Sequence, residues 1–304
     1  LFYWLNRKKQ RIVNYHHVLP ASGITANLVY GYAHSTDSFS RQLAVMRQRF
    51  ELTTEWHKPG SLVVTFDDGA LNNLTHAIPL LDALGVKAYF FVVHACCFSG
   101  QPLWIDQWYW WLSEVPAGVY WLGGREITID TAASRWEANR QLTGALLRDY
   151  GQKAQLLEEM DQIWSFTRMH SDAQQYRERF AALQPDDLEA VKAGGHQVGY
   201  HSWAHDMLGA LSETEFKQQL QQEYPNPAFN CSAYAIPFGT EAEVNQGVID
   251  QLVSAGLQPV LLNEPFSRFQ GALGRINLPD TTDAFEIHAY LSGLFHFMKF
   301  RKLL

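Results

Sequence analysis

The sequence predicts an α/β fold in which parallel strands alternate with helices. Short apolar runs rich in Val, Ile and Phe recur along the chain, as buried parallel strands require. Segments between them carry apolar residues at helical spacing. With 304 residues, 47% of them hydrophobic, the chain has ample material for one large domain or two smaller ones.

In the first hundred residues the predicted order is strand, helix, strand, helix, strand. The run before Asp67 is continuously apolar, and the second helix is amphipathic and stops at Gly85. The predicted elements are a strand over 11–18, a helix over 38–50, a strand over 62–66, a helix over 71–84 and a strand over 86–93.

The last third of the chain repeats this alternation. Pro185 opens a helix that ends at Gly194, and Ser212 with Glu215 forms a capping box at the start of another helix. The predicted strands are 197–200, 232–236, 259–262 and 275–278, and the remaining helices are 244–255 and 284 to about 299.

Between about residues 100 and 183 the pattern changes, because strand signals fade and Gln, Glu, Ala, Leu and Arg become frequent. We interpret this segment as a mainly helical insertion within a single domain of residues 1–304. Packing between helices is the main role expected for its tryptophans, and a glycan groove or lid is the alternative. Seven of the ten tryptophans lie here: Trp104, Trp108, Trp110, Trp111, Trp121, Trp136 and Trp164.

The net charge and the N-terminal residues restrict the binding partners that we expect for this protein. The formal net charge of -7 argues against a nucleic-acid-binding protein, which would normally present a basic face. The apolar run 1–5 is too short to span a bilayer, and basic residues follow it, whereas in a signal peptide they precede it. We therefore expect no transmembrane segment and a packed N-terminal segment, with an interfacial aromatic and basic foot as the alternative.

Cysteine usage bears on the cellular compartment. Cys96, Cys97 and Cys231 fit no metal spacing and no disulfide framework, so we expect buried or semi-buried thiols and a reducing compartment. The cytoplasm is the expected location, with the inner face of the membrane as one site of action. An exported protein is the alternative, since the chain does not begin with Met.

Asp67 and Asp68 follow the predicted strand 62–66. Two adjacent carboxylates are costly to bury unless a cation or a proton donor meets them. If the strand geometry continues, they point in different directions, so one can ligate a metal while the other addresses a bound water. Capping of the next helix would explain one Asp but not both.

His201 and His205 supply the matching cation site. At a spacing of i, i+4, both imidazoles project from one face if the segment is a helical turn. Two His and one Asp, with open positions left for solvent, are typical of catalytic zinc sites. A surface or core pair of histidines is the alternative, but beside two strand-terminal carboxylates we predict a divalent metal.

Three motifs together carry a family resemblance. In order, Thr65–Gly69, His201–His205 and Ile236–Gly239 closely resemble the first three motifs of the NodB-type polysaccharide deacetylases, carbohydrate esterase family four. The resemblance covers most of the chain outside the insertion and includes the strand at Ala88–Val92. It implies a distorted (β/α) barrel with fewer than eight strands, and hydrolysis of the amide bonds of N-acetylated sugars.

The resemblance also implies roles. Asp67 matches the general base, and the Phe238 N–H, between Pro237 and Gly239, matches a donor of the oxyanion hole. We also consider that Tyr200 and Trp203 stack on a sugar ring. The metal ligands, usually to zinc, correspond to Asp68, His201 and His205.

Two departures affect the base and the acid. Ala235 stands where the third motif usually has an Arg that braces the base, and no C-terminal Leu-His motif is evident, although His288 lies near the corresponding end of the chain. Residues 15–18, Tyr-His-His-Val, resemble the N-terminal strand of a branch that includes exopolysaccharide deacetylases, where an early His supplies the acid. We therefore predict His16 as the acid and Arg275 as the bracing residue, with His288 as the alternative acid.

The leading hypothesis is a metal-dependent deacetylase that releases acetate from an N-acetylated polysaccharide or glycan precursor. One alternative is an amide hydrolase of the same superfamily acting on a cyclic, non-sugar amide. Another is a non-catalytic glycan-binding protein, which Ala235 favours. The complete set of Asp67, Asp68, His201 and His205 argues against mere binding, because binding needs no base beside a metal.

Overall fold

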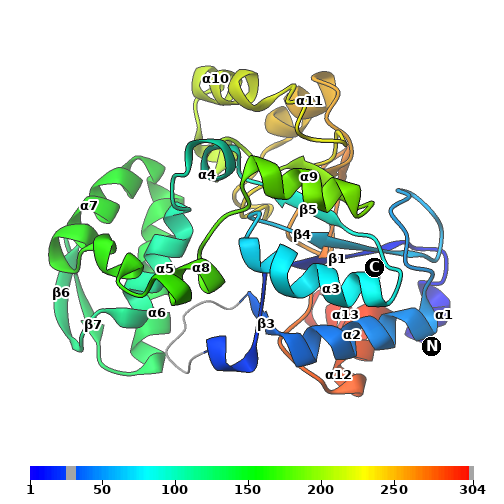
Figure 1. The fold of residues 1–304 in the computed structure, drawn as a ribbon. Helices are drawn as coiled ribbons and strands as arrows, with labels where there is room; N and C mark the ends of the chain where they lie inside the picture. The colour runs from blue at the N-terminus through cyan, green and yellow to red at the C-terminus, as the bar shows by residue number, and fades with distance from the viewer. Residues whose placement is uncertain (25–31, 301–304) are drawn as a thin grey trace.

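A parallel sheet forms the body of the molecule (Figure 1). The computed structural model describes residues 1–24 and 32–300. In this part of the chain the sheet has eight strands in the order β11-β10-β9-β8-β5-β4-β1-β12, and every neighbouring pair is parallel. The strands are β1 Arg11–Tyr15, β4 Leu62–Phe66, β5 Tyr89–Val92, β8 Gln197–Tyr200, β9 Tyr234–Ala235, β10 Val260–Leu261, β11 Ala272–Leu273 and β12 Ile276–Asn277.

The two edges of the sheet are joined by one short bend. β11 and β12 lie at opposite ends of the strand order, yet only Gly274 and Arg275 separate them in the chain. The Arg275 N–H donates to the Glu264 carbonyl at 2.7 Å, and a Cβ on Gly274 would lie 2.5 Å from the same oxygen. The sheet therefore curls into the predicted distorted barrel. Its eight strands exceed the expected number because the bend divides one segment into two.

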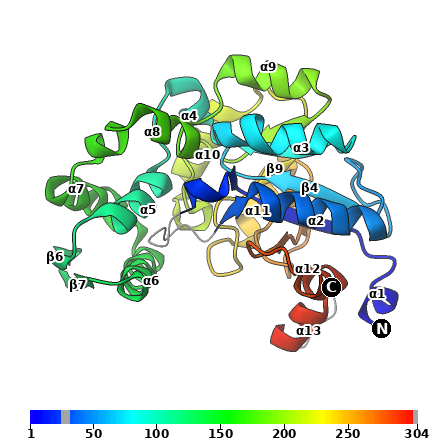
Figure 2. The ribbon, with the colours of Figure 1, turned by 60° about the horizontal axis from the view of Figure 1, so that its bottom comes forward.

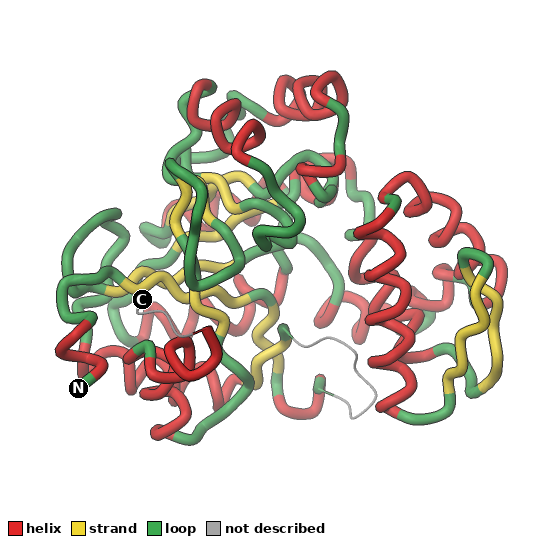
Figure 3. The backbone as a smooth tube through the Cα atoms, turned by 180° about the vertical axis from the view of Figure 1, so that it is seen from behind, coloured by secondary structure: helices red, strands yellow, loops and turns green. Residues whose placement is uncertain are grey.

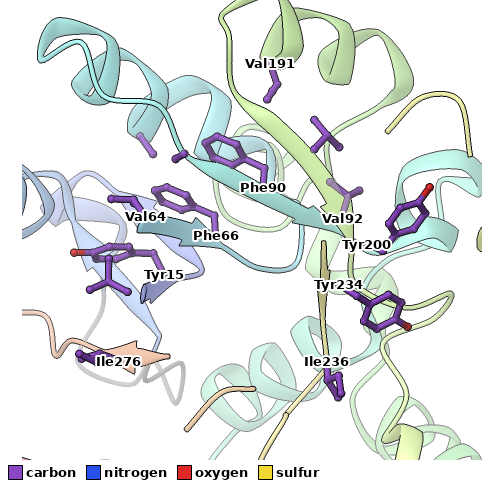
Figure 4. Close-up of a cluster of buried hydrophobic side chains, with 14 of the residues drawn as sticks. Tyr15, Val64, Phe66, Phe90, Val92, Val191, Tyr200, Tyr234, Ile236 and Ile276 are labelled. Atoms are coloured by element: carbon purple, nitrogen blue, oxygen red, sulfur yellow. The ribbon is translucent and has the colours of Figure 1, made fainter. Parts of the chain in front are cut away.

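Both faces of the strands are buried. On the outer face, register places Tyr15, Phe66 and Phe90 beside one another, with ring centroids 5.5 and 4.8 Å apart (Figure 4). On the inner face Val63 and Phe91 belong to a separate apolar cluster. This double burial explains why the strands are continuous apolar runs in the sequence.

Helices cover the outside of the barrel (Figure 2). The helix predicted over 71–84 starts with a π-helical turn, and the last predicted helix is broken at Gly293, whose φ is 87°. These helical elements are α1 Phe2–Leu5, η1 Ala21–Gly23, α2 Thr36–Arg49, η2 Asn73–Ala77, α3 Ile78–Ala83, α9 Pro185–Ala193, η5 Leu208–Ala210, α10 Glu213–Glu223, α11 Gln246–Ser254, α12 Ala284–Ser292 and α13 Leu294–Phe300.

The strand predicted over 11–18 is interrupted at His16. β1 ends at Tyr15, and β2 His17–Leu19 pairs with β3 Ala33–Ser35 in a separate two-stranded sheet. The Asn73 side chain donates to the His16 carbonyl at 2.6 Å. In a continuous strand this carbonyl would instead accept a hydrogen bond from a neighbouring strand. The interruption leaves His16 at the end of the barrel strand.

The segment between β5 and α9 lies beside the barrel and contains its own core (Figure 3). Trp108 and Trp111 are fully buried in it. An antiparallel hairpin was not predicted, although Gly123 and Gly124, both with positive φ, mark its turn. The elements are α4 His94–Ser99, α5 Trp104–Glu114, β6 Gly118–Leu122, β7 Arg125–Ile129, α6 Ala132–Arg148, η3 Tyr150–Gln152, α7 Lys153–Ile163, η4 Phe166–His170 and α8 Ala173–Arg179. Its interpretation as an insertion within one domain stays a prediction.

Two further observations concern expectations from composition. Cys96 and Cys97 are buried and Cys231 is partly buried, and none of them forms a disulfide. Within residues 1–24 and 32–300, no helix has both the length and the apolar character needed to cross a membrane.

Candidate active site

A cavity of about 130 Å³ lies where the carboxyl ends of β1, β4, β8 and β9 meet. Side chains that follow parallel strands converge at this end of a barrel, which is where such folds place their ligands. The described lining residues are His16, Tyr32, Asp67, Asp68, Ile105, Tyr109, His201, His205, Phe238, Thr240, Glu243 and Asn263.

Asp67 is buried and held by three hydrogen bonds. Arg275 donates to its two carboxylate oxygens at 2.7 and 2.6 Å, and Asn14 Nδ2 donates to Oδ2 at 2.9 Å. Burial by itself raises the pKa of Asp67, but the Arg275 guanidinium and His201 more than offset it, so the pKa lies below its usual value. Asp67 is therefore an ionised carboxylate with a fixed orientation.

Arg275 is also buried, and its position compensates for Ala235. Its Nε donates to the Leu262 carbonyl at 2.9 Å and its Nη1 to Asn14 Oδ1 at 2.9 Å. The bend that joins β11 to β12 thus places a guanidinium beside Asp67, although the two residues lie far apart in the sequence. Ala235 carries no such group.

Asp68, His201 and His205 lie together. Asp68 Oδ1 is 3.3 Å from His201 Nε2 and 3.2 Å from His205 Nε2, and one ligand atom from each of the three residues lies within 4.8 Å of the others. All three side chains are buried. One carboxylate oxygen and two imidazole nitrogens form a donor set that suits a divalent transition metal.

The two histidines do not lie on a helical turn, contrary to the prediction. Residues 201–207 form a loop in which Ser202 and His205 have positive φ angles of 65° and 56°. Ser202 Oγ accepts the His205 N–H at 2.9 Å, which stabilises this compact loop. Left-handed backbone, rather than helical periodicity, brings the imidazoles onto one carboxylate.

The loop also fixes the form of His201. Its Nδ1 lies 2.8 Å from the Ala235 carbonyl, which can only accept a hydrogen bond. Nδ1 therefore carries the proton in the neutral imidazole, and Nε2 keeps the lone pair that a metal needs.

The electrostatics of this cluster favour positive charge. Burial by itself raises the pKa of Asp68, but hydrogen bonds from His201 and His205 hold it well below the usual range. Burial by itself lowers the pKa of His201, but Asp67 and Asp68 together raise it above its ordinary value. A buried site that stabilises protons on imidazole in this way is also suited to a cation.

Residues of the segment between β5 and α9 hold the loop from outside. Trp104 Nε1 donates to the His205 carbonyl at 2.9 Å. The next residue, Asp206, accepts from Tyr150 at 2.7 Å and pairs with Lys153. These contacts therefore support His205 and Asp206, two adjacent residues of the loop.

His16 lies in the cavity, whereas His288 does not. The His16 side chain is almost buried, and its ring centroid is 4.6 Å from that of Tyr32. Burial lowers the pKa of His16, while Asp68 and Asp67 oppose this shift. His288 lies on α12 and is hydrogen-bonded to the Tyr3 hydroxyl at 2.8 Å.

The segment 237–239 forms a tight turn at the cavity edge. Phe238 and Gly239 have φ angles of 60° and 61°, and a Cβ on Gly239 would lie 2.8 Å from the Asn263 nitrogen. The Gly239 N–H donates to the Pro237 carbonyl at 2.6 Å. The Phe238 ring contacts the His205 ring, with centroids 4.9 Å apart, so the turn packs directly on the loop 201–207.

Tyr200 and Trp203 lie outside the cavity lining, contrary to the prediction that they flank the sugar. Tyr200 is buried on the outer face of the barrel against Phe229, because successive strand residues point to opposite faces and His201 points inward (Figure 4). Trp203 stacks on His94, with ring centroids 4.5 Å apart.

Some residues of the cavity were not identified from the sequence. Asn14 supports both Asp67 and Arg275, and its Nδ2 also donates to Asn263 Oδ1 at 3.2 Å. The available signal was a lone amide within the apolar strand 11–15, since a buried amide needs partners. Tyr32, Tyr109 and Glu243 had no comparable signal.

Comparisons with known proteins agree with the family resemblance seen in the motifs. Residues 146–260 match the family model described as polysaccharide deacetylase, a region that contains the His201–His205 and Ile236–Gly239 motifs. No curated protein sequence matches the chain.

Several solved structures share the fold. A protein from Bacillus anthracis, described as a polysaccharide deacetylase, superposes with a TM-score of 0.52 at 15% identity, over 92% of this chain and 68% of its own. The deacetylase PplD of Streptococcus pyogenes gives 0.52 at 15% identity, over 92% and 96%. A de-N-acetylase from Aggregatibacter actinomycetemcomitans gives 0.51 at 13% identity, over 92% and 99%. At these identities the similarity shows a shared fold, which is the predicted distorted barrel.

Proposed function

We propose that this chain, a relative of the NodB-type polysaccharide deacetylases by its motifs, family match and fold, removes N-acetyl groups from an N-acetylated polysaccharide or glycan precursor. The main support is one cavity that holds an Asp-His-His donor set and a second carboxylate braced by an arginine. Metal-assisted amide hydrolysis needs this combination of a cation and an adjacent base.

Asp68, His201 and His205 would hold the metal, which we assign as zinc because two imidazoles and one carboxylate are typical ligands of catalytic zinc. When bound, such a metal lowers the pKa of water to about 7 and polarises a carbonyl oxygen. The chain itself contributes the geometry, since the Ala235 carbonyl orients His201 and the left-handed loop orients His205.

Asp67 would act as the general base. Its carboxylate accepts the proton of the attacking water, and the bidentate Arg275 contact keeps it oriented towards the cavity. Asn14, which donates to the same carboxylate, supports that orientation.

His16 and Phe238 would complete the reaction. The water oxygen forms a bond to the acetyl carbonyl carbon, and the Phe238 N–H donates to the oxygen that becomes negative. The C–N bond then breaks, and His16, in the cationic form that Asp68 and Asp67 favour, gives a proton to the leaving nitrogen; the products are acetate and a free amine. His16 is preferred to His288 because only His16 lines the cavity.

The contact between Arg275 and Asp67 weakens the alternative of a non-catalytic glycan-binding protein. That alternative rested on Ala235, and the guanidinium that Ala235 lacks reaches the base from the bend between β11 and β12. For a cyclic amide substrate no feature of the described cavity provides specific support.

Asp67→Asn tests the proposal. This variant should retain metal, because Asp67 lies outside the Asp-His-His set, while acetate release from N-acetylglucosamine oligomers falls by about 100-fold or more. His201→Ala is the matched control and should lose metal and activity together. Metal content by elemental analysis and acetate release by an enzymatic assay give the two readings. Retained activity in Asp67→Asn would refute the assigned base.

A further inference from the structure

A second, larger cavity adjoins the catalytic one. Its volume is about 860 Å³, against about 130 Å³ for the catalytic cavity. The two share Tyr32, Ile105, Tyr109, Phe238 and Glu243 in their linings, so they lie side by side. The larger cavity extends from the catalytic centre along α5 and α6.

One face of α6 forms a wall of this groove. Its lining positions recur every three or four residues, as expected for one side of a helix. The opposite side, including Ala138 and Leu142, is buried in the core of the segment. The groove-lining positions on α6 include Ala133, Trp136, Glu137, Arg140, Gly144 and Leu147.

This wall is exposed, although it is partly apolar. The Trp136 side chain is 44% exposed and that of Leu147 is 47% exposed. Glu137 and Arg140 form an exposed ion pair between them, a kind of pair that contributes little to stability. By contrast, Trp108, which also lines the groove, is fully buried and donates to Asn139, so it has a packing role.

We propose that this groove binds the sugar units next to the one being deacetylated, so that the substrate is an oligomer or polymer; this inference depends on the proposed function. A pyranose ring has an apolar face and a rim of hydroxyls. The exposed Trp136 ring provides a surface for the face, and Glu137 with Arg140 provides partners for the hydroxyls. The volume falls within the range of about 300–1,000 Å³ that is usual for ligand sites.

Gly144 offers a second position at which a substitution can test the groove. It lies inside α6, where glycine is less favourable than alanine. A Cβ at this position would meet only Arg148 Nη1 at 3.7 Å, so a side chain fits without disturbing the core. Because Gly144 lines the groove, a long side chain here would reduce the space for a ligand.

The experiment compares acetate release from a dimer and a pentamer of N-acetylglucosamine, each with β-1,4 and β-1,6 linkage. The unmodified protein should have the higher kcat/KM for a pentamer. Trp136→Ala should lower this value by about three- to tenfold, as expected for loss of one aromatic contact, with little change for the dimer. Gly144→Met should act in the same direction, while Gly144→Ala should not.

Trp121→Ala is the matched control, because Trp121 is 65% exposed but does not line the groove. Equal effects of Trp136→Ala on dimer and pentamer, or no length preference in the unmodified protein, would overturn the inference. If no substrate releases acetate, the proposed function fails instead. Calorimetric binding of the pentamers then decides the groove: weaker binding to Trp136→Ala supports it, and equal or absent binding overturns it.

Discussion

The end of the barrel and the segment between β5 and α9 contribute to the site in different ways. At the barrel end, charged side chains are buried and paired, as Arg275 and Asp67 are. The other segment has its own apolar core and reaches the site through hydrogen bonds to the His205 carbonyl and the Asp206 side chain, and through the wall of the groove. The barrel end thus carries the groups proposed for chemistry, and the segment supports and extends them.

This difference has a physical origin. A buried charge is tolerated only with a partner in fixed geometry, so changes at the barrel end should have large effects on both folding and activity. The hydrogen bond from Trp104 to the His205 carbonyl is worth about 1 kcal/mol, so its loss should produce a graded effect.

The largest effect is expected at Arg275. Arg275→Met leaves the Asp67 carboxylate buried without its cation, which should cost about 3–5 kcal/mol of unfolding free energy. The pKa of Asp67 should then rise, and acetate release should fall by about 100-fold or more because the base is protonated and misoriented. Chemical denaturation and acetate release measure the two effects.

The double variant Asp67→Asn with Arg275→Met separates charge from packing. It should recover part of the lost stability, since no uncompensated carboxylate remains, while activity stays low. A single Arg275→Met protein with normal stability and normal acetate release would show that the ion pair has neither role.

Glu223, on α10 of the body, should make stability depend on pH. Burial raises the pKa of Glu223 to about 8 from a usual value of 4.5, although the Tyr234 hydroxyl, which donates to it at 2.9 Å, opposes the shift. The folded state therefore holds a proton that the unfolded state releases, and stability is lost as pH rises from about 4.5 to about 8.

Glu223→Gln should reduce this loss. Between pH 5 and pH 9 the variant should lose less unfolding free energy than the unmodified protein, by up to a few kcal/mol. Denaturation at both pH values measures the difference. Glu213→Gln, on the same helix but fully exposed, should leave the pH dependence nearly unchanged. Parallel pH profiles for unmodified protein and Glu223→Gln would contradict the assignment.

The sequence pattern was sufficient to predict those elements whose structure depends on neighbouring residues in the chain. The strands at 62–66 and 197–200 have the predicted bounds, because continuous apolar runs are required of strands buried on both faces. The capping box of Ser212 and Glu215 also forms as predicted. The break at His16 was missed, since it depends on the pairing of β2 with β3 and on the side chain of Asn73.

The site shows the same limit. The motifs predicted the convergence of Asp68 with two histidines, but not the left-handed loop that produces it. The contact between Arg275 and Asp67 joins residues 208 positions apart, and only the branch resemblance pointed to it. The outward direction of Tyr200 follows from strand alternation beside the inward His201, which the stacking prediction did not take into account.

The smallest expected effect concerns the support that Trp104 gives to the loop 201–207, which holds two of the proposed metal ligands. Trp104→Phe removes the indole N–H that the His205 carbonyl accepts, at a cost of about 1 kcal/mol in unfolding free energy. Because His205 has a left-handed backbone conformation, weaker support should let the imidazole move and lower zinc affinity by roughly three- to tenfold.

Trp111→Phe provides a matched control within the same helix. Trp111 also donates its indole N–H to a backbone carbonyl, that of Met160 at 2.7 Å, but Met160 lies on α7 and not in the loop 201–207. Both variants should lose similar stability, and only Trp104→Phe should bind zinc more weakly in a competition titration with a chelator. Equal zinc affinities would mean that the barrel end holds its ligands without help, and the segment would then act through the groove alone.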